Sequence, residues 1–258
     1  MKKRILSLLL VLVMLLGMLP TVALAADGTL STEKDDDGTE YYLIYDASDL
    51  AAFRTKVHNA SWGDVFNARL KDDVTLSGEW EPIGKPADWS IGFSGAAFNG
   101  IFDGEGHTVS GLSINYNGTG STCLGLFGDT NAATIRNLTV NGNITVTLPE
   151  ECKSDCMVYA GGVVGQAYLT TLEAVASHVN VTCTNNGKAT TTVGGLIGNG
   201  HRAKLSQCAN YGTIQSADVN ENSNAGGLTG ILTSSNGSAC EITNSERHNN
   251  HRRTDSDH

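Results

Sequence analysis

Charged and aromatic side chains are scarce in this sequence. Only 17% of its 258 residues are Asp, Glu, Lys or Arg, and only 6% are Phe, Trp or Tyr. Basic residues are fewer than acidic ones: the chain has 17 Lys and Arg but 27 Asp and Glu, which gives a formal net charge of −10. Nucleic acids and anionic membrane surfaces are bound through clusters of Lys and Arg. We therefore expect no nucleic-acid partner.

Long apolar runs are also missing, except at the start of the chain. A basic segment at residues 2–4 precedes an almost wholly apolar run at residues 5–19, and small residues follow up to Ala25. This order predicts a secretory signal peptide, cleaved between Ala25 and Ala26. A membrane anchor is the alternative, but the run is shorter than the roughly 20 residues that a spanning helix needs. We expect a secreted, extracellular chain, free or associated with the cell wall, that does not insert into a membrane after cleavage.

Glycine, by contrast, is abundant, and part of it recurs at a regular interval. Four short segments each hold two residues between two glycines, and their first glycines lie 37, 33 and 32 residues apart: Gly125–Gly128, Gly162–Gly165, Gly195–Gly198 and Gly227–Gly230. Self-similarity at this period indicates a repeat protein in which stacked units bury a continuous core. We expect the repeat glycines to allow positive φ angles and close backbone approach at the corners of each unit.

Apolar residues downstream of these segments form matching columns. They are Ile135, Leu172, Leu205 and Ile242; Leu138, Val175 and Cys208; and Ile144, Val181 and Ile214. Stretches such as residues 141–147 alternate β-branched and polar residues with period two, which favours strands over helices. Within the repeat segments, Leu126, Val163, Leu196 and Leu228 are predicted to form one inward stack. The sequence thus predicts an all-β fold of stacked coils.

The repeat segments resemble a known family. Their glycine-aliphatic-aliphatic-glycine core is similar to the GLUG repeat of bacterial cell-surface proteins, which also resembles segments of large immunoglobulin-A peptidases. Residues 70–76, 79–84 and 98–114 are similar to the leader coil that precedes such repeats, so the resemblance covers residues 41–245. It implies a right-handed parallel β-helix, or β-solenoid, in a secreted or wall-associated protein, with GLUG-like repeats from residue 125. It implies no chemistry.

The two ends of the solenoid differ. After a polar leader at residues 26–40, a short capping helix is predicted at residues 47–58, with Asp46 as its N-cap and Asp49 completing a capping-box-like pair. Its apolar face would cover the open edge of the first coil: Leu50, Phe53 and Val57. Residues 246–258 contain no apolar residue and are predicted to be a disordered polar tail. The last coil is then uncapped and offers a surface for self-association.

Catalytic and metal-binding constellations are not apparent, and no catalytic, cofactor-binding or metal-binding residue is assigned. The carboxylates to consider are Asp72, Asp73, Asp103 and Glu105. Asp72 and Asp73 point to opposite faces of a strand, whereas Asp103 and Glu105 lie in a glycine-flanked turn that explains them structurally. No H-E-x-x-H motif occurs. Trp80 is interpreted as a packing residue at the coil entrance rather than as part of a sugar-stacking platform.

The six cysteines fit no zinc spacing. They stand at positions 123, 152, 156, 183, 208 and 240. Export permits a disulfide between Cys152 and Cys156, which bracket a polar loop. Cys183 and Cys208 are expected to be small buried residues in strands.

Two hypotheses of function remain. The first is a non-catalytic binding or adhesion module at the bacterial surface, with a glycan or a host or bacterial protein as its ligand. The second is a carbohydrate-active β-helix enzyme, a polysaccharide lyase or hydrolase, with a site that the sequence does not reveal. An acidic, concave cluster on one face would favour the enzyme. A flat ladder of Asn, Thr and Ser would favour the binding module.

Overall fold

The computed structural model describes residues 30–61, 63–85, 96–218, 223–234 and 239–248. The predicted signal peptide and its cleavage site at Ala25 and Ala26 lie outside the described residues. So do residues 249–258 of the predicted tail.

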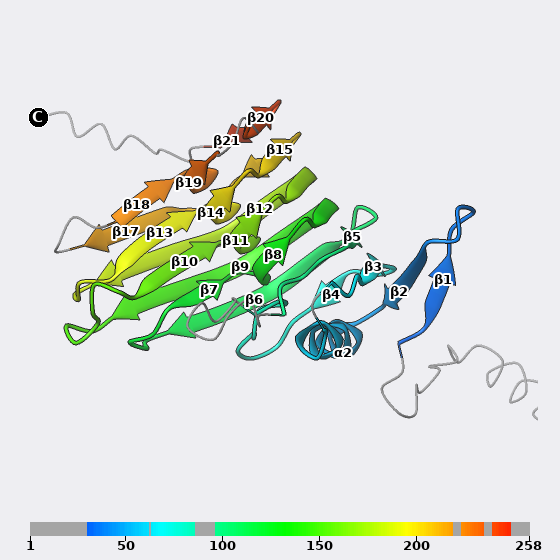
Figure 1. Ribbon diagram of the computed structural model, residues 1–258, viewed down its shortest axis with the longest axis horizontal. Coiled ribbons are helices and arrows are strands. Elements are labelled where there is room, and N and C mark those ends of the chain that lie inside the picture. Colours follow the sequence, from blue (N-terminus) through cyan, green and yellow to red (C-terminus); the bar gives the residue numbers. More distant parts are fainter. Residues whose placement is uncertain (1–29, 62, 86–95, 219–222, 235–238, 249–258) are drawn as a thin grey trace, which may run out of the picture.

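The chain winds into a parallel β-solenoid built from three sheets (Figure 1). The large sheet contains β1 (Thr32–Lys34), β2 (Glu40–Ile44), β3 (Asn67–Leu70), β4 (Val74–Thr75), β5 (Ile101–Asp103), β6 (Thr108–Tyr116), β9 (Thr134–Leu148), β12 (Thr171–Asn185), β15 (Lys204–Ser206), β16 (Ala209–Asn210), β17 (Ile214–Asp218), β20 (Glu241–Thr243) and β21 (Glu246–Arg247). The second sheet contains β7 (Thr122–Leu124), β10 (Met157–Gly161), β13 (Thr190–Gly194) and β18 (Ser223–Gly226). The third contains β8 (Phe127–Asn131), β11 (Val164–Tyr168), β14 (Ile197–His201) and β19 (Thr229–Thr233). The predicted fold class, an all-β parallel solenoid with a short helix, is confirmed.

The strands pair in the register that the repeat predicts. Leu172 pairs with Ile135 on one side and with Leu205 on the other. Leu205 in turn pairs with Ile242, so the column is kept across the longer connection that precedes β20. The coils from β9 to β15 therefore present the same positions inward and their buried residues form one continuous core, whereas Ile242 of the last coil is 44% exposed.

Both residues between the repeat glycines point inward, not only the first. Leu126 and Phe127 are fully buried, as are Leu196 and Ile197. The chain turns at this point from the second sheet into the third, so residues on both sides of the corner face the core. The predicted inward stack holds for Leu126, Val163 and Leu196, whereas Leu228 in the last coil is only partly buried.

The expectation of positive φ at the repeat glycines is wrong. None of the eight adopts it, and close packing between coils explains them instead. A Cβ on Gly162 would lie 2.3 Å from the carbonyl oxygen of Gly195, and a Cβ on Gly195 would lie 2.2 Å from that of Gly227. The left-handed corners are formed by other residue types in two columns: Ala132, Leu169 and Arg202; and Asn137, Ala174, Gln207 and Asn244.

The helix α2 (Ala47–His58) lies at the N-terminal end of the solenoid (Figure 1). The side chain of Asp46 accepts hydrogen bonds from the backbone N–H groups of Ser48 and Asp49 and so caps its first turn. Asp49 does not close a capping box on Asp46, because its carboxylate accepts the N–H of Tyr45 instead. The buried face of the helix ends the core, with the Phe53 ring 6.0 to 6.2 Å from its aromatic neighbours: Tyr42, Phe98 and Phe102.

The solenoid extends further toward the C-terminus than the sequence predicts. Residues 246 and 247, assigned to a disordered tail, form β21 and pair with β16. The N–H of Glu246 donates to the carbonyl of Cys208 at 2.9 Å, and that of His248 donates to the carbonyl of Asn210 at 3.0 Å. An edge strand binds its neighbour through the backbone, so pairing does not require the apolar side chains that the tail lacks.

Candidate functional site

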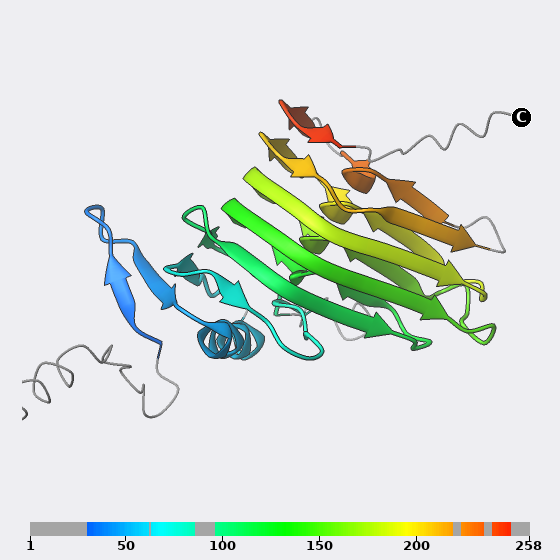
Figure 2. The same ribbon diagram turned by 180° about the vertical axis from the view of Figure 1, so that it is seen from behind.

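The long strands β9 and β12 lie side by side across one side of the molecule (Figure 2). Most of their inward residues are aliphatic or Cys, with Ser177 and Asn185 of β12 as buried polar exceptions, and the outward residues alternate with them. Toward the ends of both strands, the outward side chains are all Asn or Thr. We call this set the polar face: Asn143, Thr145, Thr147, Asn180, Thr182 and Thr184. None of its side chains is charged.

The polar face is a regular array. Asn180 pairs with Asn143, Thr182 with Thr145, and Thr184 with Thr147. Neighbouring coils are separated by about 4.8 Å, and alternate residues along a strand by about 6.6 Å. The amide of Asn180 donates to the side-chain oxygen of Asn143 at 3.1 Å and accepts from the backbone N–H of Thr213 at 3.0 Å. These bonds fix the side-chain amides of Asn143 and Asn180 before any ligand arrives.

A column of stacked rings borders the polar face. The rings of His178 and Tyr211, and those of Tyr211 and His248, have centroids 4.5 Å apart and planes within 9° of parallel. His178 lies two residues before Asn180 on β12, on the same outward side of the strand. The sequence analysis missed this column. The signal was present, since the three residues are spaced at 33 and 37 residues, which are repeat intervals.

Asp73, Asp103 and Glu105 have structural partners. Asp103 is buried and accepts hydrogen bonds from Arg136 at 2.8 Å, from Asn137 at 3.0 Å and from the backbone N–H of Glu105 at 3.0 Å. Burial alone would raise the pKa of Asp103, but these hydrogen bonds hold it below its ordinary value. A carboxyl kept ionised in this way is a poor proton donor.

The remaining candidates also join adjacent coils. Glu105 pairs with Lys71 at 3.0 Å, and Asp73 accepts the N–H of Thr108 at 2.9 Å with His107 at 3.3 Å. The carboxylates of the turn after β5 thus stabilise the stacking of coils, as their structural interpretation predicts. They do not form an acidic cluster on the polar face.

All six cysteines are free thiols. Cys183 and Cys208 are buried in the core, as expected, and burial raises the pKa of the Cys183 thiol to about 11. The sulfur atoms of Cys152 and Cys156 both contact the carbonyl oxygen of Thr119, at 3.7 and 2.8 Å, and no disulfide joins them.

Trp80 packs inside the solenoid, as predicted. Its side chain is buried and its indole N–H donates to the carbonyl of Leu126 at 3.1 Å. The guanidinium of Arg54 lies 5.0 Å from its ring centroid. The ring therefore links α2 to the core and offers no open surface to a ligand.

The described residues contain neither a metal-binding cluster nor a helix that could span a membrane. Across residues 30–248, gaps aside, no group of three or more His, Cys, Asp or Glu side chains is placed to hold a metal ion. In the same described segments, α2 is too short and too polar to cross a bilayer, and no other helix could do so.

The chain is similar in sequence to a known protein, halomucin. The chain is 29% identical over 191 residues to halomucin of Haloquadratum walsbyi, a match that covers 66% of this chain but only 2% of halomucin. Among solved structures, a candidate immunoglobulin A1 protease from Bacteroides ovatus is similar, with a TM-score of 0.41 and 14% identity over 83% of this chain and 76% of that one. No protein-family profile matches the chain.

Proposed function

We propose that this chain is a non-catalytic binding module of an extracellular or cell-surface protein, and that the polar face is its contact surface. The observation that carries this proposal is the regular, uncharged Asn and Thr array of β9 and β12. Such an array can donate and accept hydrogen bonds over its whole length, which suits an extended hydroxyl-rich or amide-rich partner, such as a glycan or a protein strand.

Two further observations support a binding role at the surface. The similarity to a stretch of halomucin supports it, because that protein is named as a mucin. The repeat segments keep their resemblance to GLUG repeats of bacterial cell-surface proteins, and their glycines stack from coil to coil. The bordering rings add partly exposed aromatic edges, with Tyr211 41% exposed.

An enzyme that acts on polysaccharides is the alternative. Glycoside hydrolysis uses two carboxyl groups on either side of the bond that is cleaved. On the polar face there is no carboxylate, and Asp103 and Glu105 are paired with Arg136 and Lys71. The geometry therefore supports binding better than catalysis.

The test is an array of glycans and of host and bacterial surface proteins, probed with the chain from Ala26 onward. A ligand that binds should lose affinity for Thr145→Arg, which places a long cation in the middle of the polar face. Met157→Arg is the matched control, because Met157 is 49% exposed on β10 of the second sheet. Equal binding by both variants would exclude the polar face as the contact surface. Cleavage of a bound polysaccharide, lost in Asp103→Asn, would support the enzyme instead.

A further inference from the structure

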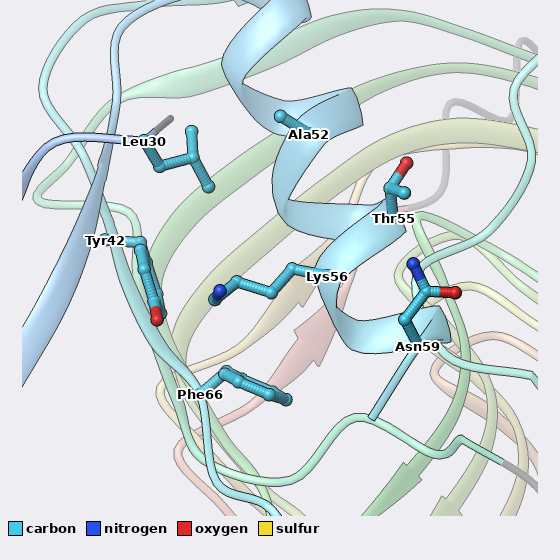
Figure 3. Close-up of a pocket in the computed structure, with 7 residues that line it drawn as sticks. All are labelled: Leu30, Tyr42, Ala52, Thr55, Lys56, Asn59 and Phe66. Atoms are coloured by element: carbon cyan, nitrogen blue, oxygen red, sulfur yellow. The ribbon is translucent and has the colours of Figure 1, made fainter. Parts of the chain in front are cut away.

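A cavity of about 440 Å³ lies beside α2, at the capped end of the solenoid (Figure 3). Tyr42 and Phe66 line one side, with ring centroids 6.3 Å apart and planes inclined at 50°. Ala52 of α2 and Asn59, the residue that caps the C-terminus of α2, line the other side. Its volume is within the range of small-molecule sites, which is about 300–1,000 Å³.

Lys56 spans this cavity. Its side chain leaves α2 and extends toward the two rings (Figure 3), and its ammonium lies 5.0 Å from the Tyr42 centroid and 5.8 Å from that of Phe66. Contacts of this kind stabilise a cation only modestly when it is exposed. They leave N–H donors of the ammonium free for an anion.

The charge of Lys56 is not neutralised by a carboxylate in the described part of the chain, because no described Asp or Glu oxygen lies within 4.0 Å of it. Two other cations, by contrast, are neutralised by a carboxylate. Arg54 and Lys85 both pair with Glu81 at 3.7 Å. In a chain of net charge −10, a cation in a cavity that no acidic residue lines is a favourable position for an anionic group.

The other residues that line the cavity indicate which further chemical groups a ligand should carry. Aromatic rings can pack against the apolar C–H face of a sugar ring, and the amide of Asn59 can both donate to and accept from hydroxyl groups. A carboxylate, a C–H face and hydroxyl groups occur together in sugars that carry a carboxyl group. A pyranose of this kind is small enough for the cavity.

We propose that this cavity binds an acidic sugar, either free or as the terminal residue of a glycan, with its carboxylate on Lys56 and its ring against Tyr42 and Phe66. The site is separate from the polar face. It would let the module select ligands that carry a negative charge, which the uncharged polar face cannot do.

The experiment is a titration of the chain from Ala26 onward with glucuronate, galacturonate and N-acetylneuraminate, followed by calorimetry and ligand-observed NMR. A ligand of this size is expected to bind with a Kd of about 1 mM. Lys56→Gln should weaken binding at least about tenfold, because it removes a charge-assisted hydrogen bond. Ala52→Phe, which fills the cavity and leaves its charge unchanged, should abolish binding, and Lys85→Gln should have no effect.

Controls separate the sources of the ligand and the two proposals. Methyl glycosides of the same acids should bind if the sugar is the end of a glycan, and only the reducing sugars should bind if it is a free ligand. Glucose and acetate should not bind. Absence of binding by all three acids at about 20 mM, equal binding of acetate, or full affinity in Lys56→Gln would overturn the assignment. None of these results affects the polar face, which is tested separately by Thr145→Arg.

Discussion

Replacement of Leu196 by Ala should lower the free energy of unfolding by about 3 kcal/mol, within the range of Leu→Ala changes in rigid cores. Leu196 is fully buried in the middle of the stack. Its N–H donates to the carbonyl of Leu228 at 2.8 Å, and its own carbonyl accepts the N–H of Val163 at 3.0 Å. Because neighbouring coils hold this coil on both sides, it has little freedom to move into the space that the Leu196→Ala change would leave empty. For a chain of this length, the loss corresponds to a fall in Tm of roughly 6–12 °C.

Leu228 is the matched control for this prediction. It occupies the equivalent position one coil later but is only partly buried, because the described chain places a coil on one side of it only. Leu228→Ala should therefore destabilise the protein by about 1–2 kcal/mol, roughly half as much. Urea unfolding followed by circular dichroism measures both variants. Equal losses would refute the reasoning that burial, and hence stability, decreases toward the last coil, and no loss in Leu196→Ala would refute the inward column itself.

The remaining predictions concern processing, local stability and pH. N-terminal sequencing of the exported protein should begin at Ala26, and retention of Met1 would contradict the secretory interpretation. Hydrogen exchange should be faster in β18 and β19 than in β13 and β14, because in the described part of the chain β18 and β19 pair with one neighbouring coil instead of two; equal protection, with light scattering that shows a dimer, would indicate that a second copy covers this end. The hydrogen bonds to Asp103 hold its pKa below the ordinary value of 3.8, so their stabilising effect is complete above that pH and is lost as the pH falls through the lowered pKa. Asp103→Asn should therefore reduce the dependence of the free energy of unfolding on pH in acid, and an unchanged dependence would argue against these bonds.

The coils and their register could be predicted because their determinants are local and repeated. The alternation around Ile144 and Val181 has period two, and the spacing of the repeat glycines gives the length of each coil. The helix could be predicted for a similar reason, since Asp46 and the apolar face of α2 lie within one short segment.

Other features depend on contacts that the sequence does not encode locally. Leu169 has a φ of 53°, although bulky residues rarely adopt this conformation, because the stack of coils imposes the corner on whatever residue stands there. The cavity joins Tyr42, Lys56 and Phe66 only because β2 and α2 meet at the end of the solenoid. β21 forms because the exposed edge of β16 offers backbone groups to pair with. The residues of the tail themselves give no sign of this pairing.

The parallel pairing of β12 with β9 on one side and with β17 on the other makes every coil a template for the next. Residues 162–194 run from one repeat glycine to the residue before the next and so comprise one coil of 33 residues. Tandem duplication of this segment in the gene would insert a coil whose two neighbours have the geometry they already have. Each insertion would lengthen the polar face by about 4.8 Å. In a protein of this design, recombination between repeats can change the reach of a binding surface while each individual contact is preserved.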